Sequence, residues 1–216
     1  MTFSFFHVSK TGGTAIKSAL SDIETEGGKI KWMPHATKLS DVLPGQEKII
    51  FFVRHPISRF ISGYYSRKNS GLPAHYKKWT KNEQIFYNKF STIDKLCDSL
   101  SSFNILERRK ANQLMGKVKH LSIRLSYSNI FTSIEYLKER RKDIFFVGFQ
   151  EKLDIDFNLL CRRIGVHGRL PTEEAAAHKG RYEIEFPCSR RLATLQKVLE
   201  KDIEIYWYLY ANYFQK

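Results

Sequence analysis

The sequence predicts an α/β fold, with a P-loop-like start and a parallel sheet that carries helices on both faces, from three observations. Short apolar runs typical of buried strands occur at 3–8, 48–53 and 143–149, with a shorter candidate at 29–32. Segments with helical spacing separate these runs, which indicates parallel strands joined by crossover helices. No internal repeat or low-complexity segment interrupts the pattern, so we expect one domain over residues 1–216.

The remaining elements follow in order from the same spacing. Pro56 stands where helices favour proline, at the first turn of a helix that continues to about Lys68. The segment 69–82 contains Gly71 and is expected to form an exposed loop, and 167–187 a functional loop or flap. The expected helices cover 15–20, 56–68, 83–101, 105–116, 129–141, 153–166 and 189–214.

A lysine and two glycines lie between the first strand and the first helix, in the segment Ser-Lys-Thr-Gly-Gly-Thr at 9–14. A turn at such a junction directs free backbone N–H groups, and the positive end of the helix dipole, at one place. Glycine lets the backbone approach a ligand closely, and Lys10 adds a point charge. The segment therefore predicts a site for phosphate or a similar anion.

A second set of anion-binding residues follows the strand at 48–53. Arg54 comes directly after this strand, and Arg59 and Ser62 follow on the next helix. Because ligands of open α/β sheets bind at the carboxyl ends of the strands, Arg54 and Ser62 are candidates to bind a second phosphate. For Arg59, a structural ion pair and a ligand contact both remain open.

The composition of the chain limits the kinds of partner it can bind and the compartment in which it works. The chain has 36 Lys and Arg against 22 Asp and Glu, a formal net charge of +14, which fits nucleic acid, an acidic glycan, a membrane surface or a polyphosphorylated nucleotide. No apolar run approaches the roughly 20 residues that cross a bilayer. The three cysteines lie far apart without a CxxC pair, which argues against a disulfide framework and a zinc site. We therefore expect a cytoplasmic protein without a membrane span.

Two segments together, FHVSKTGGT at 6–14 and RHPISRFISGYYSR at 54–67, resemble the signatures of sulfotransferases that use 3′-phosphoadenosine 5′-phosphosulfate (PAPS). MPHATKL at 33–39, ANQLMG at 111–116 and the segment 145–166 extend the resemblance over most of the chain. Together they are most similar to the carbohydrate branch that includes heparan 2-O- and 6-O-sulfotransferases. Ser9 departs from the pattern, since family members usually have proline before the loop lysine.

The resemblance implies the donor and the residues that bind it. Lys10, Thr11, Gly12, Gly13 and Thr14 would hold the 5′-phosphosulfate, and Lys10 would also stabilise charge on the leaving oxygen during in-line transfer. Arg54 and Ser62 would bind the 3′-phosphate of PAPS and of the product, 3′-phosphoadenosine 5′-phosphate (PAP). This chemistry requires no metal, so we expect no metal site.

A base must take the proton of the acceptor hydroxyl, and the resemblance implies His35 for this role, by position and neighbours. We expect His7 to pack against the strand and His55 to make a local contact beside the nucleotide phosphate. Asp41 and Glu47 are the next candidates for the base. The acceptor is expected to be a carbohydrate hydroxyl, most consistent with an acidic glycan.

Two alternatives remain. A basic polyanion- or nucleic-acid-binding module with a nucleotide-binding fold would explain the charge without catalysis, and basic and aromatic residues interleave at 64–79. An NTPase or kinase is a more distant alternative, because its Walker A lysine follows the glycines whereas Lys10 precedes them. We expect the enzyme, and no nucleic-acid partner.

Overall fold

Four parallel strands form one sheet in the computed structural model, which describes residues 2–20, 29–72, 76–172 and 185–214. The strand order is β2-β1-β3-β4. The strands are β1 (Thr2–Phe6), β2 (Lys29–Met33), β3 (Lys48–Val53) and β4 (Ile144–Phe149). Phe5 of β1 pairs with Trp32 on one side and Ile50 on the other. The predicted α/β fold and parallel sheet are therefore confirmed.

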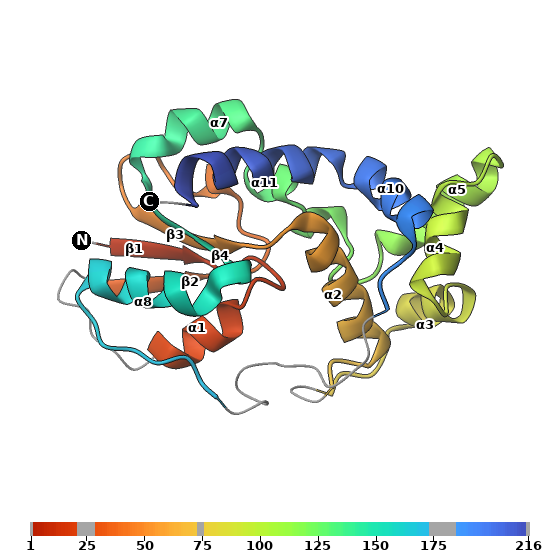
Figure 1. Cartoon of the computed structure of the whole chain (residues 1–216), viewed down its shortest axis with the longest axis horizontal. Coiled ribbons are helices and arrows are strands. Elements are labelled where there is room, and N and C mark those ends of the chain that lie inside the picture. The colour runs from red at the N-terminus through yellow and green to blue at the C-terminus, as the bar shows by residue number, and fades with distance from the viewer. Residues whose placement is uncertain (1, 21–28, 73–75, 173–184, 215–216) are drawn as a thin grey trace.

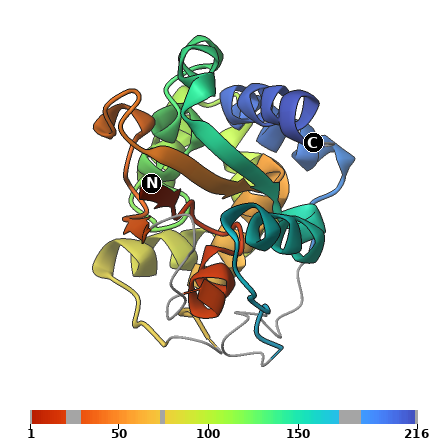
Figure 2. The ribbon, with the colours of Figure 1, turned by 90° about the vertical axis from the view of Figure 1, so that its left-hand side faces the viewer.

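Helices cover both faces of the sheet (Figures 1 and 2). Helices α1 (Gly13–Leu20) and α8 (Leu153–Ile164) pack on the face that presents Phe5, Phe52 and Phe146. Helices α6 (Tyr127–Ile130), α7 (Ile134–Glu139) and α11 (Glu200–Tyr213) pack on the opposite face. Successive strand residues face opposite sides, so the unbroken apolar runs supply both cores.

The other helices of the described ranges form a lobe beyond the sheet. The sequence did not predict that this lobe has a core of its own. It contains α2 (Pro56–Lys68), α3 (Lys81–Lys89), α4 (Ile93–Leu100), α5 (Ile105–Met115) and α10 (Ser189–Val198). Its largest buried side chains are aromatic, among them Tyr64 and Phe86. The lobe extends to the right of the sheet in Figure 1 and begins where β3 leads into α2.

Three predicted helices are each divided in two. The helix expected at 83–101 breaks before Thr92, whose side chain accepts from the Lys95 amide and begins α4. The helix expected at 129–141 breaks at Thr132, which has a φ of 69°, and Ser133 caps α7. The helix expected at 189–214 is divided at Leu199 into α10 and α11. Short 3-10 turns at 39–41, 123–125, 140–142 and 150–152 complete the described elements.

Much of the predicted loop at 167–187 lies outside the described residues, as does the centre of the loop at 69–82. The part of the latter that is described has no helix or strand before Lys81 once α2 ends. A buried ion pair joins its two sides: Arg67 of α2 donates to both carboxylate oxygens of Glu83 on α3, at 2.7 and 2.8 Å. This pair anchors α3 to α2.

Candidate functional site

The residues that follow the four strands meet at the carboxyl edge of the sheet. After β2 and β1, the rings of His35 and His7 lie 4.0 Å apart between centroids. After β3 and β4, the His55 amide donates to Glu151 at 2.6 Å. Lys10, in the loop after β1, lies close enough to Arg54 for the two charges to interact. Lys10, His35 and Arg54 therefore all follow strands at the same edge of the sheet.

The loop after β1 holds Lys10 in a left-handed backbone conformation, with a φ of 66°. A residue with a side chain pays of order 1–3 kcal/mol for such a conformation, and functional sites are where it is commonly retained. Gly12 also has a positive φ, of 88°. The buried Thr11 hydroxyl donates to the Val8 carbonyl at 2.9 Å, so this hydroxyl stabilises the loop itself. Of the polar groups of Thr11, the backbone amide is the one the predicted ligand contact would use.

The start of α1 has backbone amides that the helix itself does not use. The amides of the first turn of a helix have no partner within the helix, and here this turn begins at Gly13. A Cβ on Gly13 would lie 2.3 Å from His7 Cδ2, so the glycine lets the His7 ring pack against the helix start. The half-buried His7 ring therefore packs against the helix start, and the glycine has a structural reason besides ligand approach.

Positive charge gathers at the edge of the sheet around Lys10. The pKa of Lys10 is lowered to about 8 by burial first, and then by the charges of Arg54 and Lys119. Lys119, in the segment after α5, is exposed at its surface, and partial desolvation, followed by the charges of Lys77 and Arg67, lowers its own pKa. A half-buried lysine beside other cations is stabilised by an anion, because a bound negative charge offsets the repulsion.

Arg54 and Ser62 lie at the start of α2 and along it. The Arg54 guanidinium donates through Nε to Ser58 Oγ at 3.1 Å. Ser58 and Ser62 are four residues apart, one turn of the helix, so they share one face. Ser62 is buried. The structure thus adds Ser58, which sequence reasoning missed although its spacing of four from both Arg54 and Ser62 is the available signal.

A buried network supports Arg54. The Tyr127 hydroxyl accepts from the Arg54 amide and donates to the Arg54 carbonyl, both at 2.7 Å. Arg59 lies over the Tyr127 ring at 4.4 Å and donates to Asp202 on α11 at 3.0 Å. Asp202 also accepts from the Tyr127 and Ser128 amides. The open question about Arg59 is therefore answered: it makes a structural ion pair that joins α2 and α11.

His35 is oriented by the strand beside it. Its Nδ1 lies 2.7 Å from the His7 carbonyl oxygen. Since a carbonyl only accepts, Nδ1 carries the hydrogen and Nε2 keeps its lone pair in the neutral ring. Burial lowers the pKa of His35, the His7 hydrogen bond opposes this, and Lys119 adds to the lowering. The neutral ring is thus prepared to accept a proton at Nε2.

The two carboxylates considered in place of His35 are engaged elsewhere. Asp41 accepts from the Lys38 amide at 2.8 Å within its own 3-10 turn. Glu47 precedes β3, at the amino edge of the sheet, where it is bonded to Ser4 and Lys31. The amino edge is opposite to the edge that carries Lys10 and His35, so Glu47 is poorly placed to act on the same substrate.

His120 is a further residue of this region that sequence reasoning missed. Its Nδ1 lies 2.7 Å from the hydroxyl of Ser9, which is buried and precedes Lys10. Burial lowers the pKa of His120 to about 3, with Lys10 and Lys119 adding to the effect. No motif marks His120 in the sequence, and its contact with Ser9 spans 111 residues. His120 is therefore a neutral ring beside the lysine loop.

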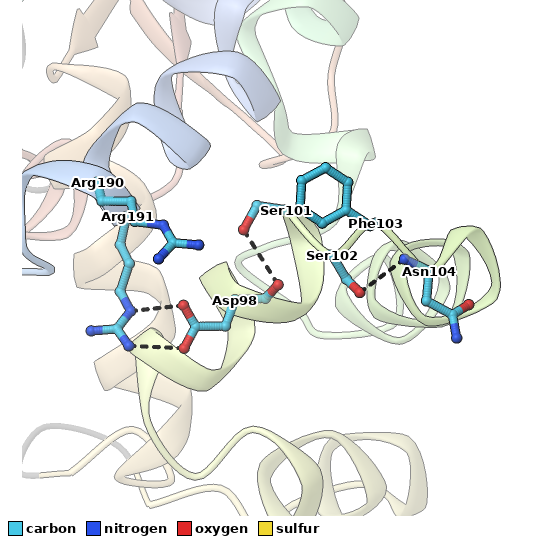
Figure 3. Close-up of a pocket in the computed structure, with 7 residues that line it drawn as sticks. All are labelled: Asp98, Ser101, Ser102, Phe103, Asn104, Arg190 and Arg191. Atoms are coloured by element: carbon cyan, nitrogen blue, oxygen red, sulfur yellow. Dashed lines mark hydrogen bonds and ion pairs between the residues drawn. The ribbon is translucent and has the colours of Figure 1, made fainter.

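A separate hollow of about 400 Å³ lies between the α4–α5 turn and the start of α10 (Figure 3). Arg191 donates to both oxygens of Asp98 there, at 2.9 and 2.8 Å, and to Asp94 at 2.8 Å. These carboxylates balance the guanidinium charge. The residues predicted to bind the donor are not among those lining this hollow, so it is a different place from the sheet edge.

The comparison with protein families decides the assignment. The model of the sulfotransferase family matches residues 2–215. The chain belongs to the sulfotransferase family. This sulfotransferase is therefore an enzyme that transfers a sulfuryl group from a donor to an acceptor, and the matched region includes every residue of the sheet edge described above. Comparison with curated protein sequences gives no match.

None of the helices in the described ranges combines the length and the apolar character needed to cross a bilayer. Within those ranges, α11 is the longest helix, with 14 residues. Its length is below the roughly 20 residues that a bilayer requires.

Proposed function

We propose that this sulfotransferase moves a sulfuryl group from PAPS to a hydroxyl group of a carbohydrate, with PAP as the other product. The observation that carries the proposal is the gathering of positive charge at the sheet edge, where Lys10, in the loop that leads into α1, lies near Arg54. PAPS is the usual donor of the family, and it carries two separate anionic groups. The loop after β1 and the start of α2 offer two separate places for them.

The residues of this edge suit such a donor. The backbone amides from Thr11 to Thr14 would hold the 5′-phosphate, because those at the start of α1 have no helical partner. Arg54, with Ser58 and Ser62 along the same face of α2, would hold the 3′-phosphate. Tyr127 would fix Arg54 by its main chain, so that the guanidinium meets the ligand with little loss of entropy.

Lys10 and His35 would carry out the transfer. The bound donor supplies the sulfuryl group. His35 takes the proton of the acceptor hydroxyl at Nε2, while its Nδ1–H continues to donate to the His7 carbonyl oxygen. Lys10 neutralises the charge that develops on the phosphate oxygen as its bond to sulfur breaks. With the backbone amides holding that phosphate, attack and departure are kept in line. We assign no role to a metal ion.

The acceptor and the setting are inferred from charge and cysteine content. Lys119 is exposed and its charge reaches both Lys10 and His35, so an acidic glycan would be attracted to the acceptor side. With the sequence resemblance, this favours the carbohydrate branch of the heparan 2-O- and 6-O-sulfotransferases. The cysteines Cys97, Cys161 and Cys188 are unpaired, which favours the cytoplasm as the compartment.

The nucleic-acid-binding alternative loses its main support. It depended on basic and aromatic residues that interleave at 64–79, as in a surface on which bases stack. Tyr64 and Tyr65 are buried in the helical lobe, and Arg67 is paired with Glu83. Trp79 stacks on Tyr87 and donates its indole N–H to the Arg67 carbonyl. Of the described aromatic residues here, Tyr64, Tyr65 and Trp79 pack in the lobe, and Tyr76 is exposed.

Calorimetric titration with PAP tests the donor site. One-to-one binding, tighter than that of adenosine 5′-phosphate (AMP), is expected because AMP lacks the group that Arg54 would bind. Equal affinities for the two nucleotides would contradict the proposed 3′-phosphate site. Binding of several PAP molecules per chain would instead indicate nonspecific attraction to a basic surface.

A further inference from the structure

We propose that His120 is a positioning residue, which sets the spacing between the two phosphate-binding elements of the donor site. The inference rests on the proposed function, because it assumes that the lysine loop and α2 bind the two phosphates of one nucleotide. His120 lies between these elements and contacts both. Neither the motifs of the sequence nor the family match assigns it a role.

The contact with the lysine loop is a hydrogen bond. His120 Nδ1 lies 2.7 Å from the Ser9 hydroxyl, and Ser9 as a whole residue is 1% exposed. Ser9 immediately precedes Lys10, the residue with the left-handed backbone. A bond at this position therefore restrains the start of the loop that would hold the 5′-phosphate.

The contact with α2 is a close packing of backbone. A Cβ on Gly63 would lie 3.0 Å from His120 Cβ and 3.2 Å from the His120 carbonyl oxygen. The helix thus approaches residue 120 this closely because residue 63 has no side chain. Gly63 directly follows Ser62, so His120 packs against the turn of α2 that carries the proposed 3′-phosphate ligand.

The ring keeps one charge state while it holds these contacts. Besides Lys10 and Lys119, the groups that disfavour a proton on it are His35 and Arg67, all positive when charged. Its Nδ1 therefore remains a neutral hydrogen-bonding atom across the pH range in which His35 titrates. The neutral His120 ring adds no positive charge to the site, and it holds the two anion-binding elements at a fixed separation.

A fixed separation matters for a ligand with two phosphates and little for a ligand with one. When one phosphate of PAP is bound, the second meets its site at a high effective concentration only if the spacing fits. A nucleotide with a single phosphate uses one element and does not sense the spacing. Loss of the His120 contacts should therefore lower the affinity for PAP more than the affinity for a nucleotide with one phosphate.

Titration calorimetry with PAP, AMP and adenosine 3′-phosphate tests this on the full chain. His120→Ala should weaken PAP by about tenfold or more, which is about 1.4 kcal/mol, and each single-phosphate nucleotide by less than about twofold. Ser9→Ala removes the same bond from the other side, without altering the packing at Gly63, and should change the affinities in the same direction. His120→Asn should recover most of the loss, because its amide can place a polar atom near the position of Nδ1. His167→Ala, at an exposed histidine beyond α8, is the matched control.

The titrations distinguish a failure of this inference from a failure of the proposed donor site. An equal loss for all three nucleotides in His120→Ala would make His120 an ordinary structural residue and overturn the inference, as would unchanged PAP affinity in both His120→Ala and Ser9→Ala. If the wild-type protein binds PAP no better than the single-phosphate nucleotides, the proposed donor site itself fails. That outcome is seen before any variant is made, so the two failures are distinguishable.

Discussion

Tyr127 holds Arg54 by both of its main-chain polar groups, with its hydroxyl 2.7 Å from the Arg54 nitrogen and 2.7 Å from the Arg54 oxygen. The hydroxyl is buried and lies 73 residues away in sequence. Arg54 is the first residue after β3, where the backbone leaves the ladder of the sheet and needs other partners. The tyrosine supplies them, and so fixes where the guanidinium starts.

Tyr127→Phe should therefore affect both stability and nucleotide binding. It leaves two main-chain groups without this partner, so we expect unfolding to become easier by about 1–3 kcal/mol, measured by denaturant titration. PAP binding should weaken as well, because Arg54 is less well positioned. Tyr213→Phe is the control, since the Tyr213 hydroxyl is buried without a partner among the described residues and its removal should cost little. If the two variants lose the same stability, the bonds to Arg54 contribute nothing measurable.

Lys10→Ala should lower turnover far more than PAP binding. Lys10 is proposed to act on charge that develops at the leaving oxygen, whereas the backbone amides and Arg54 hold the ground state. We expect the barrier to rise by about 2–4 kcal/mol, measured as kcat at saturating PAPS. Lys17→Ala, an exposed lysine of α1, is a control that keeps the loop intact. Near-normal turnover in Lys10→Ala would remove Lys10 from the mechanism.

The pH dependence of kcat/KM should be bell-shaped. On the acid side the rate rises as His35 loses its proton, at a pKa below the usual value of about 6.5 because burial disfavours the charged ring. On the alkaline side the rate falls as Lys10 loses its proton, at a pKa of about 8 in the free enzyme.

Two variants test which residue causes each limb of the pH profile. Lys10→Arg should retain a charged group at high pH and shift the alkaline limb out of the accessible range, even if its turnover is reduced. His35→Ala should flatten the acid limb with PAP affinity close to wild type. An acid limb that persists in His35→Ala would assign the base to another residue.

Arg54→Ala should weaken binding of the 3′-phosphate and leave binding of the 5′-phosphate nearly unchanged. Affinity for PAP should fall strongly, by about 1.5–3 kcal/mol for the loss of hydrogen bonds to a charged group, while AMP binding stays nearly unchanged. Competition binding with both nucleotides measures this difference. Arg124→Ala, at an exposed arginine of the nearby 3-10 turn, is a control for the loss of one positive charge. Equal losses for PAP and AMP would indicate that Arg54 supports the fold or binds another group.

Much of the fold could be predicted because its signals are local. The apolar runs of β1, β3 and β4 specify buried strands by themselves, and Pro56 marks the start of α2. The divided helices could not be foreseen, because apolar spacing continues through Thr92 while a capping hydroxyl restarts the helix there. The helical lobe depends on contacts between distant segments, such as Arg67 with Glu83, that no periodicity reveals.

In the candidate site as well, some residues could be predicted from local signals and others could not. Lys10 and Arg54 follow strands directly, so parallel topology alone places them at one edge. Tyr127, Asp202 and His120 act through contacts that span 73, 143 and 111 residues, and each looks ordinary in its own segment. The role of Arg59 likewise required the position of Asp202. Residues that hold a site in place are therefore harder to predict than those proposed to bind the ligand.

Transfer itself is the most direct test of the account. The enzyme is incubated with PAPS and a panel of glycans in the presence of EDTA, and mass spectrometry follows the acceptors while chromatography follows PAP. The account predicts that an acceptor gains the mass of one sulfuryl group for each PAP released, and that Lys10→Ala slows both together. Release of PAP with inorganic sulfate alone, or transfer that stops in EDTA and returns with Mg²⁺, would contradict it.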